Sequence, residues 1–222
     1  MSKMTTITRK ILMALSGFFL LFFLLQHFSI NFLSVASPQA FNEVSQFMGT
    51  NPLVQYVLQP VLIFGIIFHF VMAFVLELQN SAARPVKYFS KSNTGGTAVS
   101  KNMLISGVTI LLFLALHMYD FWWHEMSVKY INGDLSGLNE QGGFRYHEEL
   151  VAKFQNIVRV VIYIAAFTFL GLHTNHGFQS SFQSVGINHP KYTPVIKSIG
   201  FLYSVFIPVG FSLIAIYHYL FN

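Results

Sequence analysis

Long apolar stretches separated by shorter polar segments dominate the pattern of this chain. Five of them match the ~20 predominantly apolar residues that a helix needs to cross the hydrocarbon core of a bilayer. They cover about 11–33, 54–76, 103–123, 157–177 and 199–221. The pattern therefore predicts an all-α fold, an integral membrane bundle of five transmembrane helices that forms one domain over residues 1–222.

Lys and Arg fall mostly on one side of this predicted bundle. Nine of the 13 lie in the N-terminal segment and in the connections after the second and fourth stretches. Basic residues concentrate in the cytoplasmic connections of membrane proteins. We therefore expect a multi-pass protein of the cell (inner) membrane, with its N-terminus cytoplasmic and its C-terminus outside. The longest connection, about 124–156, is then external, and we expect a short amphipathic helix near 146–155.

Composition narrows the chemistry that the chain can support. Charged residues make up 9% of the sequence, whereas a soluble domain has about 25%. The chain has no cysteine, which excludes disulfides, Cys-ligated iron–sulfur clusters and covalently attached c-type haem. No basic and aromatic interleaving indicates a nucleic-acid surface, so no nucleic-acid partner is expected.

One histidine lies late in each of the first four stretches, at His27, His69, His117 and His173. Successive helices run in opposite directions, so the rise of ~1.5 Å per residue places His27 and His117 near the outer face. The same arithmetic places His69 and His173 near the cytoplasmic face, with roughly 10–18 Å between the two levels. An ionisable residue at hydrocarbon depth is a functional hypothesis by default. Two facing imidazoles are the axial ligands of a six-coordinate haem iron, so the pattern predicts two haem b groups.

Glycines accompany this histidine pattern. Gly17 and Gly107 each lie ten residues before an outer histidine, which places them at the level of the inner pair. A glycine there leaves room beside a porphyrin edge, as Gly65 would near His69. Ordinary packing of helices through small residues is the alternative reading.

Three further polar residues have two readings each. His176 lies three residues after His173 and is the rival ligand of the inner iron. Arg159 can pair with a haem propionate, because guanidinium recognises carboxylates, or its head can extend to the interface. His218 can approach the outer haem or a quinone, although an interfacial position is the simpler expectation.

Reduction of a quinone takes up protons as well as electrons, so a quinone site needs a group that exchanges protons. Glu43 and Asp120 lie on the predicted outer side and are candidates. Each is also explained as a solvated charge in a connection. The quinone is the expected substrate, but the pattern does not locate its site.

The chain resembles the cytochrome b subunits of succinate dehydrogenases and fumarate reductases, and most closely the five-helix, two-haem type often called b558. The resemblance spans nearly the whole chain and depends on the order and spacing of several segments. They are KILMALSGFFLLFFLLQH, FHF at Phe68–Phe70, LQNSAARPVKY, MLISGVTILLFLALH and LGLHTNHGFQSSFQSVG.

The resemblance implies that His69 and His173 bind the inner haem iron and that His27 and His117 bind the outer one. It also implies a flavoprotein subunit and an iron–sulfur subunit on the cytoplasmic face, which interconvert succinate and fumarate. In such a complex II of the tricarboxylic acid cycle, the present chain exchanges electrons with a membrane quinone. The basic segment with Arg84, Pro85 and Lys87 is the expected docking surface, unless its charge reflects orientation alone.

One departure from the family bears on direction. Some fumarate reductases of this type carry a glutamate two residues before the fourth ligand, where this chain has Gly171. That difference favours succinate oxidation over quinol:fumarate reduction. Two other readings stay open at this point, namely a histidine-relay transporter without haem and a stand-alone transmembrane cytochrome.

Overall fold

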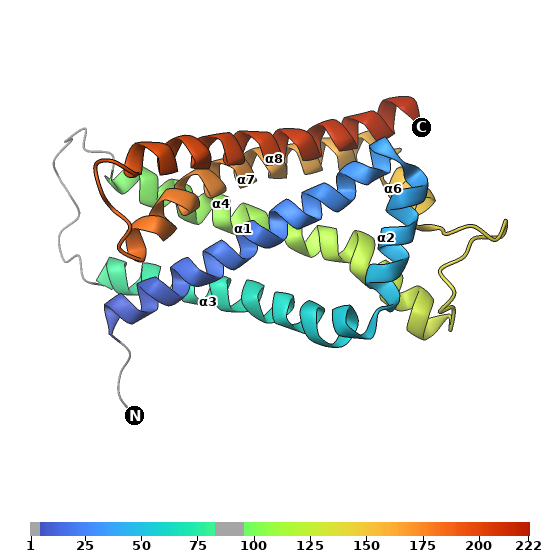
Figure 1. The fold of residues 1–222 in the computed structure, drawn as a ribbon, viewed down its shortest axis with the longest axis horizontal. Coiled ribbons are helices and arrows are strands. Elements are labelled where there is room, and N and C mark those ends of the chain that lie inside the picture. The colour runs from blue at the N-terminus through green and yellow to red at the C-terminus, as the bar shows by residue number, and fades with distance from the viewer. Residues whose placement is uncertain (1–4, 83–95) are drawn as a thin grey trace.

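The structure is a computed structural model that describes residues 5–82 and 96–222, with only the backbone over residues 96–102. Its described residues form an elongated helical bundle without a sheet (Figure 1). The elements in chain order are α1 (Thr6–Ala36), α2 (Pro38–Thr50), η1 (Val54–Leu58), α3 (Gln59–Ala82), α4 (Gly96–His117), η2 (Met118–Trp123), α5 (His124–Met126), η3 (Ser127–Ile131), α6 (Tyr146–Phe154), α7 (Ile157–Ser184) and α8 (Thr193–Phe221).

Five continuous helical segments are long and apolar enough to cross a membrane, which confirms the predicted class of fold. Each contains one of the five predicted stretches. The third is longer than predicted, because α4 continues through η2, α5 and η3 to Ile131. Residues 124–131 are therefore helical, although the sequence pattern placed them in the external connection. The basic segment of Arg84, Pro85 and Lys87 lies outside the described residues.

Short helices gather at one end of the bundle, together with the connection 132–145 and the end of α8 (Figure 1). We call this the α2–α6 end; it corresponds to the predicted external side. Helix α6 matches the predicted amphipathic helix. Helix α2 was not predicted, and it begins at a sharp break where Ser37 caps it by accepting a bond from the amide of Ala40 and Pro38 occupies the first turn.

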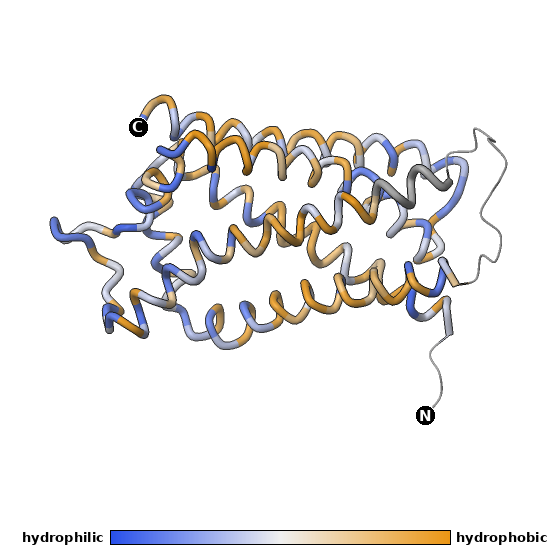
Figure 2. The backbone as a smooth tube through the Cα atoms, turned by 180° about the vertical axis from the view of Figure 1, so that it is seen from behind, coloured by the Kyte–Doolittle hydropathy of each residue, from blue (hydrophilic) through white to orange (hydrophobic). Residues whose placement is uncertain are grey.

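Apolar side chains cover the outside of the long helices and not only their interior. Exposed residues such as Phe22, Phe64 and Leu112 lie along α1, α3 and α4. Segments of hydrophilic residues lie mostly at the two ends of the bundle (Figure 2). A soluble protein rarely exposes large contiguous apolar surfaces, whereas lipid solvates them. The distribution is that of a bundle solvated by a bilayer.

The tightest packing lies between α1, α7 and α8, towards the α2–α6 end. Phe28 of α1, Phe167 of α7 and Phe211 of α8 are buried against one another. Phe154 extends this core from α6, and its ring packs on Tyr163. Helix α3 packs mainly on α1. His69, which lies on α3, therefore approaches the remaining helices from one side of the bundle.

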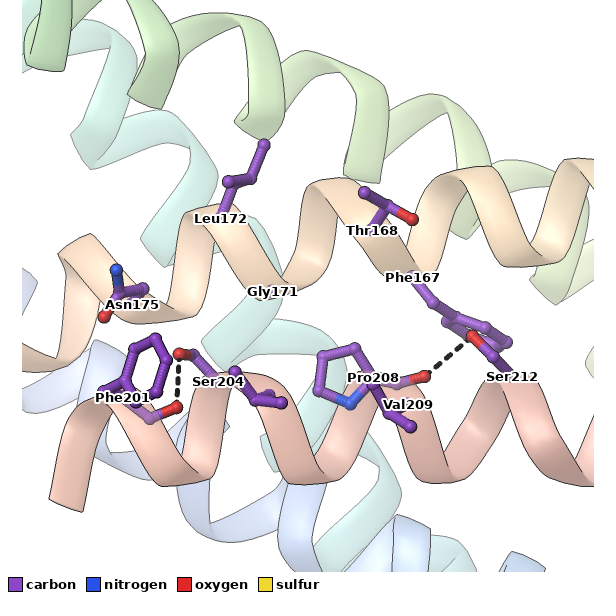
Figure 3. Close-up of a pocket in the computed structure, with 11 residues that line it drawn as sticks. Phe167, Thr168, Gly171, Leu172, Asn175, Phe201, Ser204, Pro208, Val209 and Ser212 are labelled. Atoms are coloured by element: carbon purple, nitrogen blue, oxygen red, sulfur yellow. Dashed lines mark hydrogen bonds between the residues drawn. The ribbon is translucent and has the colours of Figure 1, made fainter. Parts of the chain in front are cut away.

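Gly171 marks the closest approach of α7 to α8. Pro208 lies inside α8 and has no amide hydrogen, so the carbonyl of Ser204 loses its helical donor. A Cβ at Gly171 would lie 2.9 Å from that carbonyl oxygen. The two helices flank a groove of about 280 Å³ at this level (Figure 3). The Cβ of any side chain at residue 171 would therefore meet the backbone of α8 unless the helices moved apart.

Gly171→Ala should destabilise the bundle by about 1–3 kcal/mol, because backbone atoms cannot move aside as a flexible side chain can. Gly177→Ala on the same helix is the matched control, since an added methyl there meets nothing within 4 Å. The control should be neutral or more stable by up to about 1 kcal/mol. Thermal unfolding in detergent, followed by circular dichroism, measures both. Equal melting temperatures for the two variants would contradict this account of Gly171.

Candidate functional site

Two pairs of imidazoles lie inside the bundle at two levels. The rings of His27 on α1 and His117 on α4 have centroids 5.7 Å apart. The rings of His69 on α3 and His173 on α7 have centroids 6.4 Å apart. These are the two pairs that the depth arithmetic predicts, so four different helices meet in pairs through histidine.

A serine hydroxyl holds one nitrogen of each histidine in the second pair. Ser16 Oγ lies 3.0 Å from Nδ1 of His69, and Ser106 Oγ lies 3.2 Å from Nδ1 of His173. Each hydroxyl donates its hydrogen to a backbone carbonyl of its own helix, at Met13 or Met103. The hydroxyl therefore accepts from the imidazole, and Nδ1 carries the hydrogen. The other nitrogen, Nε2, is then the acceptor in both rings, and no hydrogen bond to it is found among the described residues.

The two serines occupy equivalent places in the fold, and the sequence pattern missed them. Each belongs to a Ser-Gly dipeptide, Ser16-Gly17 or Ser106-Gly107, and each lies eleven residues before a histidine of the other pair. The repeated dipeptide at one fixed spacing is the signal that could have found them. Since each serine contacts the second pair, the helical rise places the two pairs about 16 Å apart along the helices.

The glycines separate into two groups. A Cβ at Gly107 would lie 3.6 Å from the His173 ring, and one at Gly17 would lie 3.9 Å from the His69 ring. Both are therefore beside the imidazoles as predicted, although a Cβ at Gly17 would also lie 3.0 Å from Ser181 of α7. A Cβ at Gly65 would lie 2.6 Å from the Phe19 ring, so Gly65 serves the contact between α1 and α3.

Aromatic rings surround the pair nearer the α2–α6 end. Phe23 stacks on His27 at 5.4 Å, and Phe121 lies 5.2 Å from His117. Nδ1 of His117 is buried and has no hydrogen-bond partner. Nε2 of His27 has one long contact, at 3.5 Å from the side-chain nitrogen Nδ2 of Asn31. One ring nitrogen of each histidine in this pair therefore has no hydrogen bond, or only a long one, within the described residues.

Each pair can hold a metal only if the ligand brings further donors. Protein metal sites commonly use about four or more donors, and in the described part of the chain no cluster of three or more His, Asp or Glu suitable for a metal is found. A porphyrin iron needs only two axial ligands from the protein. Imidazole nitrogens lie about 2 Å from a bound metal, which separates opposed ring centroids by about 6 Å. The separations of 5.7 and 6.4 Å fit that requirement.

The structure pairs Arg159 with Asp120. The guanidinium Nη2 lies 3.1 Å from Oδ1 of Asp120, and the hydroxyl of Tyr163 donates to Oδ2 at 2.8 Å. Asp120 is fully buried, which corrects its reading as a solvated charge. Glu43 is exposed on α2 and accepts a hydrogen bond from Gln39.

Two other histidines are also placed. His176 contacts the carbonyl of Leu172 in its own helix at 3.2 Å, and no second imidazole stacks on it among the described residues. His218 is fully buried rather than interfacial, and its Nε2 lies 2.8 Å from Ser34 Oγ. His147 of α6 reaches the carbonyl of Ser34. The last two histidines join the ends of α1, α6 and α8.

An ionic network closes the α2–α6 end. Arg145 binds Glu125 at 2.7 Å and Glu149 at 2.6 Å, and Lys129 binds Glu125 at 2.9 Å. Burial lowers the pKa of Arg145, but the two carboxylates outweigh burial and raise it above its ordinary value. Burial also raises the pKa of Tyr146 to about 12. These groups therefore keep their charge states at neutral pH and anchor the connection to the bundle.

No protein-family model, curated protein or solved structure matches the chain.

Ser16→Ala and Ser106→Ala should each destabilise the bundle by about 1–3 kcal/mol, because a buried imidazole N–H is left without an acceptor. Ser29→Ala is the matched control on α1, since its exposed hydroxyl bonds only to Leu25 of its own helix. Denaturant unfolding in detergent measures the three variants. The proposed hydrogen bonds are wrong if the Ser16 and Ser106 variants are as stable as the Ser29 variant.

Proposed function

We propose that this chain is a membrane cytochrome b that carries electrons through two bis-histidine b haems. His27 and His117 would bind one haem, and His69 and His173 would bind the other. The observation that carries the proposal is the matched arrangement of Ser16 with His69 and Ser106 with His173. Histidines that bind metal almost always donate their second ring nitrogen to a fixed acceptor, which sets the tautomer and the ring orientation.

Haem, when bound, supplies one-electron redox chemistry, and the protein supplies ligands, burial and orientation. The serines present Nε2 of each inner imidazole as an acceptor. Gly17 and Gly107 keep side chains away from those rings, as their neighbours show. Phe23 and Phe121 pack their rings against the outer pair. These residues favour tight binding of a flat, apolar group between helices.

We further propose that the chain is the membrane-anchor subunit of a succinate:quinone oxidoreductase. This step depends on the resemblance of its segments to such subunits. A flavoprotein subunit and an iron–sulfur subunit would bind the cytoplasmic face, because the chain has no cysteine to ligate a cluster of its own. The haem that His69 and His173 would hold would supply the redox group nearer the iron–sulfur subunit, and the haem that His27 and His117 would hold would supply the one nearer a membrane quinone. Electron flow from a quinol towards the iron–sulfur subunit would make it a quinol:fumarate reductase.

Purification of the chain from its native membranes, with a reduced-minus-oxidised absorbance spectrum and a subunit analysis, tests both steps. We expect two b haems per chain and two co-purifying soluble subunits. Haem without those subunits would support a stand-alone cytochrome and contradict the anchor assignment. A colourless protein would contradict both steps and favour a histidine-relay transporter.

His69→Ala and His173→Ala should each remove one of the two haems and leave the other in place, because the levels are about 16 Å apart along the helices. His176→Ala is the matched control, since its ring contacts its own helix. Haem content per chain and the spectrum of the remaining haem are the measurements. Retention of both haems in the two ligand variants would refute the inner pair, and loss of one haem in the control would identify His176 as the ligand.

A further inference from the structure

Asp120 is a buried carboxylate in a membrane-spanning helix, and haem binding by the four histidines does not use it. It is the one acidic residue among the buried side chains of the described segments, with an exposed fraction of 0%. A carboxylate at this depth is costly unless it is paired, and intramembrane carboxylates commonly serve proton transfer. The ion pair with Arg159 and the hydrogen bond from Tyr163 offset part of this cost.

The backbone places Asp120 close to the outer histidine pair. The π-helical segment η2 begins directly after His117 and contains Asp120; such segments frequently occur at functional sites. The Tyr163 hydroxyl donates to Asp120 Oδ2 at 2.8 Å, and the Tyr163 ring lies 6.3 Å from the His117 ring. A single side chain therefore connects the carboxylate with an imidazole of that pair.

The Asp120 carboxylate also has one oxygen that accepts no hydrogen bond, and its neighbour Arg159 is partly exposed. Oδ1 lies 3.1 Å from Arg159 but accepts no hydrogen bond, so it can take a proton without losing the bond from Tyr163 to Oδ2. Arg159 is 28% exposed at its side chain and extends from the buried carboxylate towards the surface. The ionisable groups that face Asp120 in the described structure are Arg159 and Tyr163 from α7, with His117 one turn earlier on its own helix.

We propose that Asp120 is the group that takes up a proton when the haem that His27 and His117 would hold is reduced by one electron. This proposal rests on the proposed function, in which the electron comes from the iron–sulfur subunit. One proton enters from the external aqueous phase, an O–H bond forms on Asp120, and no other bond forms or breaks. The added proton balances the added negative charge in a medium of low dielectric constant. When the electron passes on to the quinone, the O–H bond on Asp120 breaks and its proton returns to the external aqueous phase.

Potentiometric titration of the haems in the purified complex at a series of pH values tests the proposal. The midpoint potential of one haem should fall with rising pH, by up to about 59 mV for each tenfold decrease in proton concentration. Asp120→Asn should remove this slope and leave the other haem unchanged. Glu140→Gln, an exposed carboxylate in the 132–145 connection, is the control and should keep the slope.

Arg159→Gln separates proton uptake from a purely structural role. Arg159→Gln removes the ion pair with the carboxylate, so the pH dependence of this haem's potential should shift while haem content stays the same. A structural role alone predicts no such shift. If the Asp120 variant does not assemble, an unshifted slope in Arg159→Gln overturns the proposal.

Different results would overturn the proposed function and the assignment of Asp120. Wild-type protein without haem overturns the proposed function and this proposal together. Wild-type protein with haem whose potentials do not depend on pH, or keep their slope in Asp120→Asn, overturns only the assignment of Asp120.

Discussion

The requirement to satisfy imidazole nitrogens in hydrocarbon organises the interior of this protein. Water cannot reach these groups freely, so each needs a partner from another helix or from a ligand. At the second pair, Ser16 and Ser106 meet this need in the same way on two different helices. Their hydroxyls are themselves occupied by backbone carbonyls, which leaves one tautomer and one free nitrogen per ring. The same bonds thus join the helices in pairs and fix the tautomer of each ring.

The α2–α6 end and the middle of the bundle are held together by different interactions. At the α2–α6 end, an ionic network around Arg145 and the buried His218 bind short helices to the ends of α1 and α8. In the middle, α7 and α8 approach through Gly171, where a carbonyl freed by Pro208 faces a residue without a side chain. Rigidity at the end and close packing between α7 and α8 hold the histidine-bearing helices in place.

Buried polar atoms without a hydrogen-bond partner lie at and beside the outer pair. Nδ1 of His117 and Oδ1 of Asp120 are both buried without a hydrogen bond. At the other pair, the corresponding nitrogens are bonded to serine. Under the proposed function, this asymmetry would assign electron transfer alone to the His69–His173 pair, and proton exchange as well to the His27–His117 pair. That division is consistent with a quinone reacting on the outer side.

Hydropathy determined by itself the five spans, since lipid-crossing helices need long apolar runs whatever their neighbours are. Helical rise and alternating direction were enough to pair His27 with His117 and His69 with His173. Local sequence did not reveal α2, the continuation of the third span to Ile131, or the burial of Asp120 and His218, because each depends on contacts with distant residues. Only the tertiary structure decided that Ser16 and Ser106 bond to the imidazoles, since a serine in a membrane helix can equally bond to its own backbone.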